Sequence, residues 1–177
     1  MHESSWLEMQ RVIAERCRPE DNLIVADIGS MSVKAKGWQG RTYREHMQPN
    51  WKYHGLDIAE GRNVDTVMPS PDVIPLVNSW ADVIISGQCL EHTKAPWVLI
   101  REMFRVLKHG GQIFLTAPAI WPWHRYPVDC WRFYPDGMAA LLKWGGFDKI
   151  KTWSSNPDAV RNITGEWADC WGVGVKL

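Results

Sequence analysis

Short apolar runs alternate with amphipathic stretches along this chain. Residues 5–17 carry apolar side chains at helical spacing, which predicts an N-terminal helix. The stretch 96–108 begins with a proline and shows the same helical spacing of apolar residues. Gly110-Gly111 follow it and are expected to end that helix. A further helix is predicted over 135–143, closed by Gly145-Gly146, and a short one over 42–48.

The apolar runs between these helices predict strands. They cover residues 22–28, 51–58, 64–67, 81–86, 112–116, 148–153 and 171–177. The run ADVIIS at 81–86 is almost continuously apolar, as in a strand that is buried on both faces. Strands that alternate with helices predict an α/β fold: a Rossmann-like, doubly wound and mostly parallel sheet.

The chain shows no internal repeat, low-complexity tract or charged linker, so a single domain over residues 1–177 is expected. Two connections are unusual. Residues 119–133 are rich in aromatic residues and proline, and residues 154–169 are long for a compact domain. Both connections are predicted to lie at the substrate-binding side of the domain.

Polar residues and glycines stand where several of the predicted strands end. Asp27 ends the first strand, Asp57 the second, and Ser86–Gln88 follow the run at 81–86. Because ligands of open α/β sheets bind beyond the carboxyl ends of the strands, these residues are expected to meet at one edge.

The residue types at that edge favour a nucleoside that carries an amine. An ionised Asp57 offers two acceptor oxygens to the two hydroxyls of a ribose, and Asp27 would attract an ammonium group. Gly29 allows a close approach of the backbone to the ligand. A pyrophosphate would require more glycines, so the missing G-x-G-x-x-G argues against a nicotinamide-dependent oxidoreductase. S-adenosylmethionine fits this pattern.

Four segments together resemble the class I S-adenosylmethionine-dependent methyltransferases, and most closely the methyltransferase type 11 group. They are VADIGS, YHGLDI, WADVIISGQCLEH and REMFRVLKHGGQIFLTAP, followed by HRYPVDCWRFYPDGM at 124–138. The resemblance covers roughly residues 20–150. It implies a seven-stranded sheet whose last strand is antiparallel and lies beside the sixth.

The resemblance also implies a set of cofactor-binding residues. It places Asp27 and Gly29 at the methionine end, Asp57 at the ribose, the segment 70–73 near adenine, and Gly87-Gln88 near the sulfonium. The complete predicted set is Asp27, Gly29, Ser30, Asp57, Ile58, Asp72, Gly87 and Gln88. Two departures from the family pattern are the residues Ser-Met-Ser after Gly29 and the sequence SPDVIPL at the adenine side.

Methyl transfer from a sulfonium is an in-line displacement, so the enzyme mainly positions the acceptor and removes its proton. His124 is the candidate base, Asp129 would orient it, and Arg132 would hold a carboxylate or phosphate of the substrate. Trp121, an aromatic residue of the same loop, is expected at the wall of the pocket. The predicted substrate-binding residues are His92, Trp123, Tyr126 and Trp131.

Other interpretations of these residues stay open. Asp129 and Arg132 can simply pair with each other, and the tryptophans can pack beneath residues 154–169. Glu91 and His92 can brace the 119–133 loop instead of contacting substrate. A structural zinc site formed by Cys89, His92, His124 and Cys130 is a further alternative, although the spacing is unusual; no metal is predicted.

Composition narrows the range of partners. Twenty basic residues balance twenty acidic ones, which argues against binding to nucleic acid or an anionic membrane. The sequence shows no signal peptide and no long apolar segment, and its four cysteines are scattered, so a cytoplasmic location is expected. Twelve tryptophans permit a homodimer without requiring one.

The sequence therefore predicts S-adenosylmethionine-dependent methylation of a small molecule, such as a sugar or a metabolite hydroxyl. The alternative is a catalytically silent, cofactor-binding partner subunit of another protein, because the short chain leaves little sequence for a substrate lid.

Overall fold

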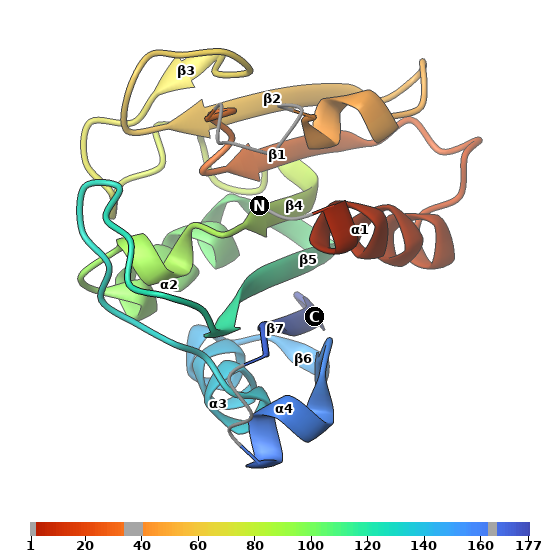
Figure 1. The fold of residues 1–177 in the computed structure, drawn as a ribbon. Coiled ribbons are helices and arrows are strands. Elements are labelled where there is room, and N and C mark those ends of the chain that lie inside the picture. The colour runs from red at the N-terminus through yellow and green to blue at the C-terminus, as the bar shows by residue number, and fades with distance from the viewer. Residues whose placement is uncertain (1–2, 34–40, 163–165) are drawn as a thin grey trace.

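The computed structural model describes residues 3–33, 41–162 and 166–177. Its centre is a seven-stranded sheet with the strand order β3-β2-β1-β4-β5-β7-β6 (Figure 1). The strands are β1 (Ile24–Ile28), β2 (Lys52–Asp57), β3 (Thr66–Val67), β4 (Ala81–Gly87), β5 (Leu107–Ile120), β6 (Asp148–Ser154) and β7 (Ala168–Val175).

The first five strands pair in parallel, whereas β7 lies antiparallel between β5 and β6. The sequence-based prediction of a doubly wound, mostly parallel sheet with an antiparallel last strand is thus confirmed. Chain order reverses at β1, since β2 lies on one side of it and β4 on the other. The carboxyl ends of these three strands therefore flank the switch point at which ligands of such sheets bind.

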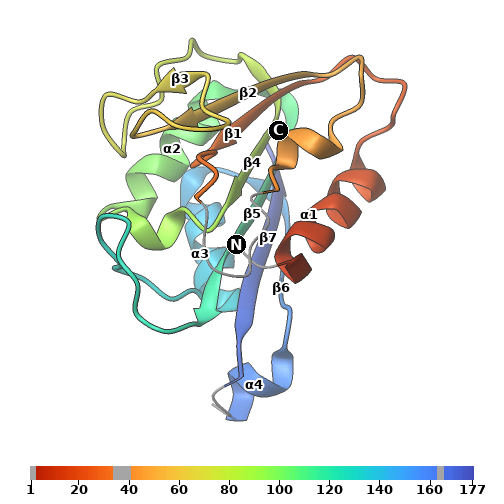
Figure 2. The ribbon, with the colours of Figure 1, turned by 45° about the horizontal axis from the view of Figure 1, so that its top comes forward.

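Helices cover both faces of the sheet (Figure 2). One face is covered by α2 (Pro96–Val106) and α3 (Pro135–Gly145), and the other by α1 (Glu3–Arg16). Successive strand residues point to opposite faces. In β5, for example, Ile113 belongs to the core beneath α2 and α3, and Phe114 belongs to the core beneath α1. This alternation explains why the central strands are apolar throughout.

The end of α2 differs from the prediction. The helix ends at Val106, and β5 begins at Leu107, which pairs with Ala81 of β4. The expectation that Gly110-Gly111 stops this helix is therefore wrong. These glycines lie within β5, where the register against β4 shifts and the Gly110 N–H donates to the carbonyl of Lys176 at 2.7 Å. Helix α3, in contrast, is closed by the predicted glycine pair: it ends at Gly145, and Gly146, whose φ of 103° is left-handed, caps it.

The remaining segments are short. They are the 3-10 helices η1 (Tyr43–His46) and η2 (Leu90–His92) and the helix α4 (Pro157–Asn162), which lies inside the connection predicted at 154–169. The 119–133 connection largely lacks regular structure after β5 ends at Ile120. In the described part of the chain, every helix is too short or too polar to cross a bilayer.

Candidate functional site

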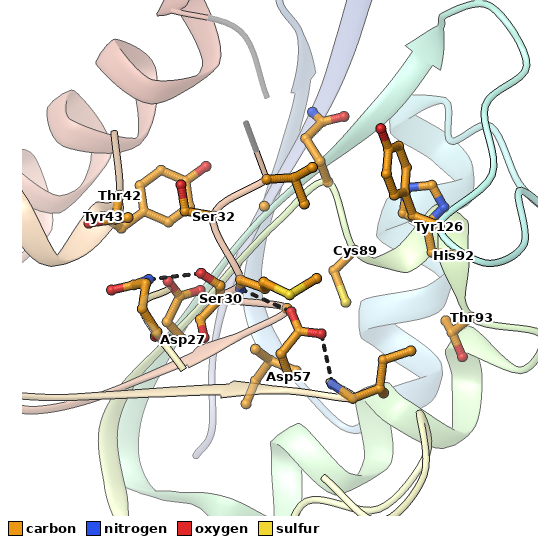
Figure 3. Close-up of a pocket in the computed structure, with 18 of the residues that line it drawn as sticks. Asp27, Ser30, Ser32, Thr42, Tyr43, Asp57, Cys89, His92, Thr93 and Tyr126 are labelled. Carbon is orange, nitrogen blue, oxygen red and sulfur yellow. Dashed lines mark hydrogen bonds between the residues drawn. The ribbon is translucent and has the colours of Figure 1, made fainter. Parts of the chain in front are cut away.

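A cavity of about 640 Å³ opens at the carboxyl ends of β1, β2 and β4 (Figure 3). Seven of the eight predicted cofactor residues line it: Asp27, Gly29, Ser30, Asp57, Ile58, Gly87 and Gln88. The eighth, Asp72, is not among the lining residues. Its carboxylate accepts a hydrogen bond from the Thr93 hydroxyl at 3.2 Å, and the neighbouring Pro71 lines the cavity instead.

Asp57 is held in place by backbone donors on both of its oxygens. Oδ2 accepts the N–H of Met31 at 2.9 Å, and Oδ1 accepts the N–H of Ile58 at 2.7 Å. A carboxylate oxygen has two acceptor sites, so each one retains capacity for a further donor. Asp57 therefore presents a fixed pair of acceptors to the cavity, an arrangement that suits two adjacent hydroxyl groups.

Gly29 is required by both conformation and space. Its φ of 79° lies in the left-handed region, and a Cβ atom built on it would lie 2.6 Å from Cβ of Cys89. The N–H groups of Gly29 and Ser30 donate to the Leu56 carbonyl at 2.8 and 3.0 Å. The single glycine thus turns the chain at the cavity wall and brings β1 and β2 together.

Asp27 is buried at the cavity wall and has few polar partners. Its carboxyl accepts a hydrogen bond from the hydroxyl of Tyr53, which in turn accepts one from the amide of Asn63 at 2.8 Å. Burial raises the pKa of Asp27 to about 7, and the nearby charge of Asp57 acts in the same direction. A cation in the cavity would favour the ionised form of this carboxyl.

Tyr43 of η1 is a cavity residue that sequence reasoning missed. The residue is buried, yet its hydroxyl has no hydrogen-bond partner among the described residues. A Cβ atom at Gly87 would lie 2.2 Å from that hydroxyl, so glycine is needed there for Tyr43 to reach the site. The sequence carries no signal for this contact, because residues 43 and 87 meet only in the folded sheet.

Gln88 connects the end of β4 to β7. Its φ is 56°, its N–H donates to the Thr116 carbonyl at 2.9 Å, and its side-chain amide donates to Asp169 at 3.0 Å. Asp169 also accepts a hydrogen bond from Ser5 of α1. These bonds fix the floor of the cavity where the resemblance places the sulfonium.

The residues predicted to bind substrate separate into two groups. His92 and Tyr126 line the cavity, as does the predicted base His124, whereas Trp123 and Trp131 do not. Trp123 is 73% exposed, and the indole N–H of Trp131 donates to the Thr93 carbonyl at 2.9 Å. In Figure 3, Asp27 lies on one side of Asp57, and His92 and Tyr126 lie on the other side.

Trp121, which was expected at the wall of the pocket, lines the cavity, and so does Trp167, which the sequence did not assign to the site. Their ring centroids are 4.5 Å apart. Residues 154–169 therefore contribute to the site through Trp167, as the length of this connection suggested.

Asp129 and Arg132 pair with each other, which is the alternative that the sequence left open. The guanidinium donates to both carboxylate oxygens at 2.5 and 2.8 Å and also to the Trp121 carbonyl. Hydrogen bonding from Arg132 lowers the pKa of Asp129 to about 2. Neither residue lines the cavity. Asp129 also accepts the backbone N–H of His124 at 2.7 Å, so the pair shapes the loop that carries His124.

Glu91 is fully buried beside His92, with its Oε1 3.5 Å from Nε2 of that histidine. Burial raises the pKa of Glu91 to about 8. The zinc alternative grouped two cysteines with two histidines. Among the described residues, the group that could hold a metal is Glu91, His92 and His124, without Cys89 or Cys130.

The sheet order, with antiparallel β7 inserted between β5 and β6, is the one that the resemblance to the class I S-adenosylmethionine-dependent methyltransferases implied. Comparison with known proteins agrees. Residues 38–115 match the sequence model of a family described as "Methyltransferase domain". The resemblance seen in the sequence is thus confirmed, and S-adenosylmethionine is the cofactor of that family.

One curated relative is a chloroplastic 2-methyl-6-phytyl-1,4-hydroquinone methyltransferase from Spinacia oleracea. It is 25% identical over 97% of this chain and 54% of its own length. The chain thus spans about half of this relative.

Solved structures share the fold at low identity. Phosphoethanolamine N-methyltransferase 2 of Haemonchus contortus has a TM-score of 0.70 at 14% identity, over 96% of this chain and 52% of its own. The YcgJ protein of Bacillus subtilis has a TM-score of 0.69 at 16% identity, over 99% of both chains.

Proposed function

We propose that this chain transfers the methyl group of S-adenosylmethionine to a small-molecule acceptor that enters beside His92, His124 and Tyr126. The observation that carries the proposal is the placement of Asp57. Its two oxygens are fixed by backbone donors and face a cavity that also contains a buried acid at its other side. A sulfonium cofactor with an ammonium group and a ribose diol matches both carboxyl groups.

The residues present fit this cofactor. Asp27 would receive the ammonium group, since its burial leaves a carboxyl that a cation would stabilise. Asp57 would accept the ribose hydroxyls. The buried hydroxyl of Tyr43 has no hydrogen-bond partner within the described ranges, and a polar ligand group would provide one. The cavity volume of about 640 Å³ lies within the usual range for cofactor sites, about 300–1,000 Å³.

The acceptor side of the cavity combines aromatic walls with two imidazoles. Trp121 and Tyr126 offer flat apolar surfaces, which suit an acceptor with a planar or apolar part. A hydroxyl acceptor also fits the hydroquinone named for the Spinacia oleracea relative.

The bound cofactor supplies an activated methyl group, so the protein orients the acceptor and removes its proton. We propose that His124 takes this proton. Its Nδ1 lies 3.0 Å from the Pro122 carbonyl, which can only accept, so Nδ1 carries the hydrogen and Nε2 retains a lone pair.

Calorimetric titration with S-adenosylhomocysteine tests the cofactor site. Asp57→Ala is expected to weaken binding at least tenfold, because two hydroxyl groups would lose a charged acceptor. Asp158→Ala is the matched control, since that side chain is 85% exposed on α4 and should leave binding unchanged. Equal affinities in the two variants would contradict the assignment of Asp57.

A second variant separates an enzyme from a silent cofactor-binding subunit. Methyl transfer to a panel of phenolic and sugar hydroxyls should fall at least 100-fold in His124→Ala, with S-adenosylhomocysteine binding retained. A wild-type protein that binds the cofactor but methylates none of these acceptors would favour the silent subunit.

A further inference from the structure

The 3-10 helix η2 and the loop of residues 121–134 are joined by hydrogen bonds beside the cavity. The Cys130 N–H donates to the Glu91 carbonyl at 2.7 Å, and the Trp131 indole donates to the Thr93 carbonyl at 2.9 Å. His92 Nδ1 lies 2.6 Å from the Val128 carbonyl. These bonds hold side chains from two distant parts of the sequence in a fixed relation.

This arrangement gathers Glu91 and His92 from η2 and His124 from the loop. One ligand atom from each lies within 4.8 Å of the other two. The two imidazole rings meet edge to face, with centroids 4.9 Å apart. Both histidines line the cavity, whereas Glu91 lies behind them and is completely buried.

Glu91 supplies an independent indication of a ligand. Its side chain is 0% exposed, and neither carboxylate oxygen has a hydrogen-bond partner in the described part of the chain. A buried polar group without partners is costly and rare in folded proteins. Its Oε1 instead faces Nε2 of His92 at 3.5 Å. A cation held between the carboxylate and the imidazoles would provide the missing partner.

Both histidines are oriented as metal ligands usually are. The Val128 and Pro122 carbonyls can only accept, so each receives the Nδ1 hydrogen of the neighbouring imidazole, His92 at 2.6 Å and His124 at 3.0 Å. Each ring therefore keeps the lone pair of Nε2. Metal-binding histidines commonly donate their second ring N–H to a carbonyl or carboxylate in this way.

We propose that Glu91, His92 and His124 bind a divalent transition-metal ion of the Zn²⁺ type at the acceptor side of the cavity. Two imidazoles and one carboxylate form a three-ligand set that leaves an open coordination position. Ligands at about 2.1 Å from zinc lie about 3.4 Å apart in a tetrahedral site. The 3.5 Å separation of Glu91 and His92 already matches this spacing.

With the ion bound, Nε2 of His124 would be a ligand, so His124 would serve as the proton acceptor proposed above only in the metal-free chain. An acceptor hydroxyl at the open position would ionise more readily and release its proton to water. Its oxygen would then form the new bond to the methyl carbon, and the carbon–sulfur bond would break with its electron pair left on sulfur. This use of the ion rests on the proposed function; binding of the ion does not.

Zn²⁺ binding to the tag-free, chelator-treated full chain tests the site directly, without cofactor or acceptor. Equilibrium dialysis should give one Zn²⁺ per chain, with affinity reduced at least tenfold in Glu91→Gln and in His124→Ala. Glu91→Gln keeps the shape of the side chain and removes its charge, and circular dichroism would verify that it folds. Two controls, His109→Ala and Cys130→Ser, change exposed residues and should bind as the wild type does.

Replacement of Zn²⁺ by Co²⁺ adds a readout on the wild-type chain alone. Ligation by nitrogen and oxygen should give visible d–d bands without the near-ultraviolet charge-transfer band of a cobalt thiolate. Substoichiometric Zn²⁺, equal affinity in all variants, or a thiolate band would each overturn the proposed ligands. Because none of these measurements uses methyl transfer, their failure is distinguishable from failure of the proposed function.

Discussion

At the scale of single residues, Asp27 and Asp57 are both acids at strand ends, but their surroundings give them different properties. Asp57 receives two backbone N–H groups, which stabilise a carboxylate. Asp27 is 2% exposed, and its carboxyl accepts a hydrogen bond from the Tyr53 hydroxyl. Burial raises the pKa of Asp27 to about 7. Only the structure shows this difference in surroundings, because the sequence shows the same residue type at the end of each strand.

The raised pKa of Asp27 predicts a pH dependence of stability. The folded state binds this proton more tightly than the unfolded state, so the contribution is full below about pH 4 and lost as pH rises through about 7. In ligand-free protein, Asp27→Asn should remove a slope of up to about 1.4 kcal/mol per pH unit from the free energy of unfolding. Urea denaturation across this range measures the slope.

The exposed Asp158 provides the control for this experiment. Asp158→Asn should show the same slope as the wild type, since its side chain is 85% exposed. If the stabilities of wild type and Asp27→Asn ran parallel between pH 4 and 7, Asp27 would not be the buried, neutral acid described above.

Single residues also show the limit of sequence-based prediction at the site. Asp27, Gly29 and Asp57 were predicted because strand ends can be located from apolar runs. Tyr43 and the buried carboxyl of Glu91 were not assigned to a site, because what distinguishes them is the lack of hydrogen-bond partners among the residues that the structure describes. Absence of a partner depends on packing between distant segments, and no local pattern reports it.

At the scale of elements, the 121–134 loop is held by the Asp129–Arg132 pair. The Asp129 side chain is 1% exposed, so removal of its partner would leave a buried carboxylate poorly compensated. Arg132→Ala should destabilise the loop by about 1–3 kcal/mol. Hydrogen exchange of the loop amides measures this loss, and S-adenosylhomocysteine affinity should change little.

Arg161→Ala on α4 is the matched control for the loop. Its contact with Asp158 is 3.9 Å long between side chains that are 76% and 85% exposed, so no change is expected there. Arg132→Lys should restore only part of the protection, because one ammonium cannot match both carboxylate oxygens. Unchanged exchange in Arg132→Ala would show that the pair does not hold the loop.

Element boundaries were predictable where local chemistry sets them. Helix α3 ends at Gly145 because Gly146, the capping residue, adopts the left-handed φ without strain. Helix α2 ends four residues before Gly110 because pairing of Leu107 with Ala81 extends β5 backward along the chain. Long-range strand pairing overrode the local glycine signal in that case.

At the scale of the whole molecule, stability depends on how closely α3 packs on the sheet. A Cβ atom at Gly172 of β7 would lie 2.6 Å from Cγ of Met138 and 3.0 Å from Leu142. Gly172→Ala is therefore expected to lower the global free energy of unfolding by about 1–3 kcal/mol. Chemical denaturation, monitored by circular dichroism, measures this change in the free energy of unfolding.

Gly137 lies in α3, and alanine at this position is expected to have the opposite effect on stability. Apart from its chain neighbours and the backbone of its own helix, no described residue has an atom within 4 Å of a Cβ built at this position, and glycine is an unfavourable residue in a helix. Gly137→Ala should therefore raise stability by about 0.5–1 kcal/mol. Equal effects of the two alanine substitutions would show that the contact between α3 and β7 is looser than described.

The insertion of β7 between β5 and β6 has a consequence for biosynthesis. In the described sheet, β6 pairs only with β7, so β5 and β6 cannot join until β7 arrives. A nascent chain on the ribosome therefore carries an open edge on β5 until residue 175 has left the exit tunnel. A translational pause before residue 168 would leave that edge available to chaperones or to aggregation.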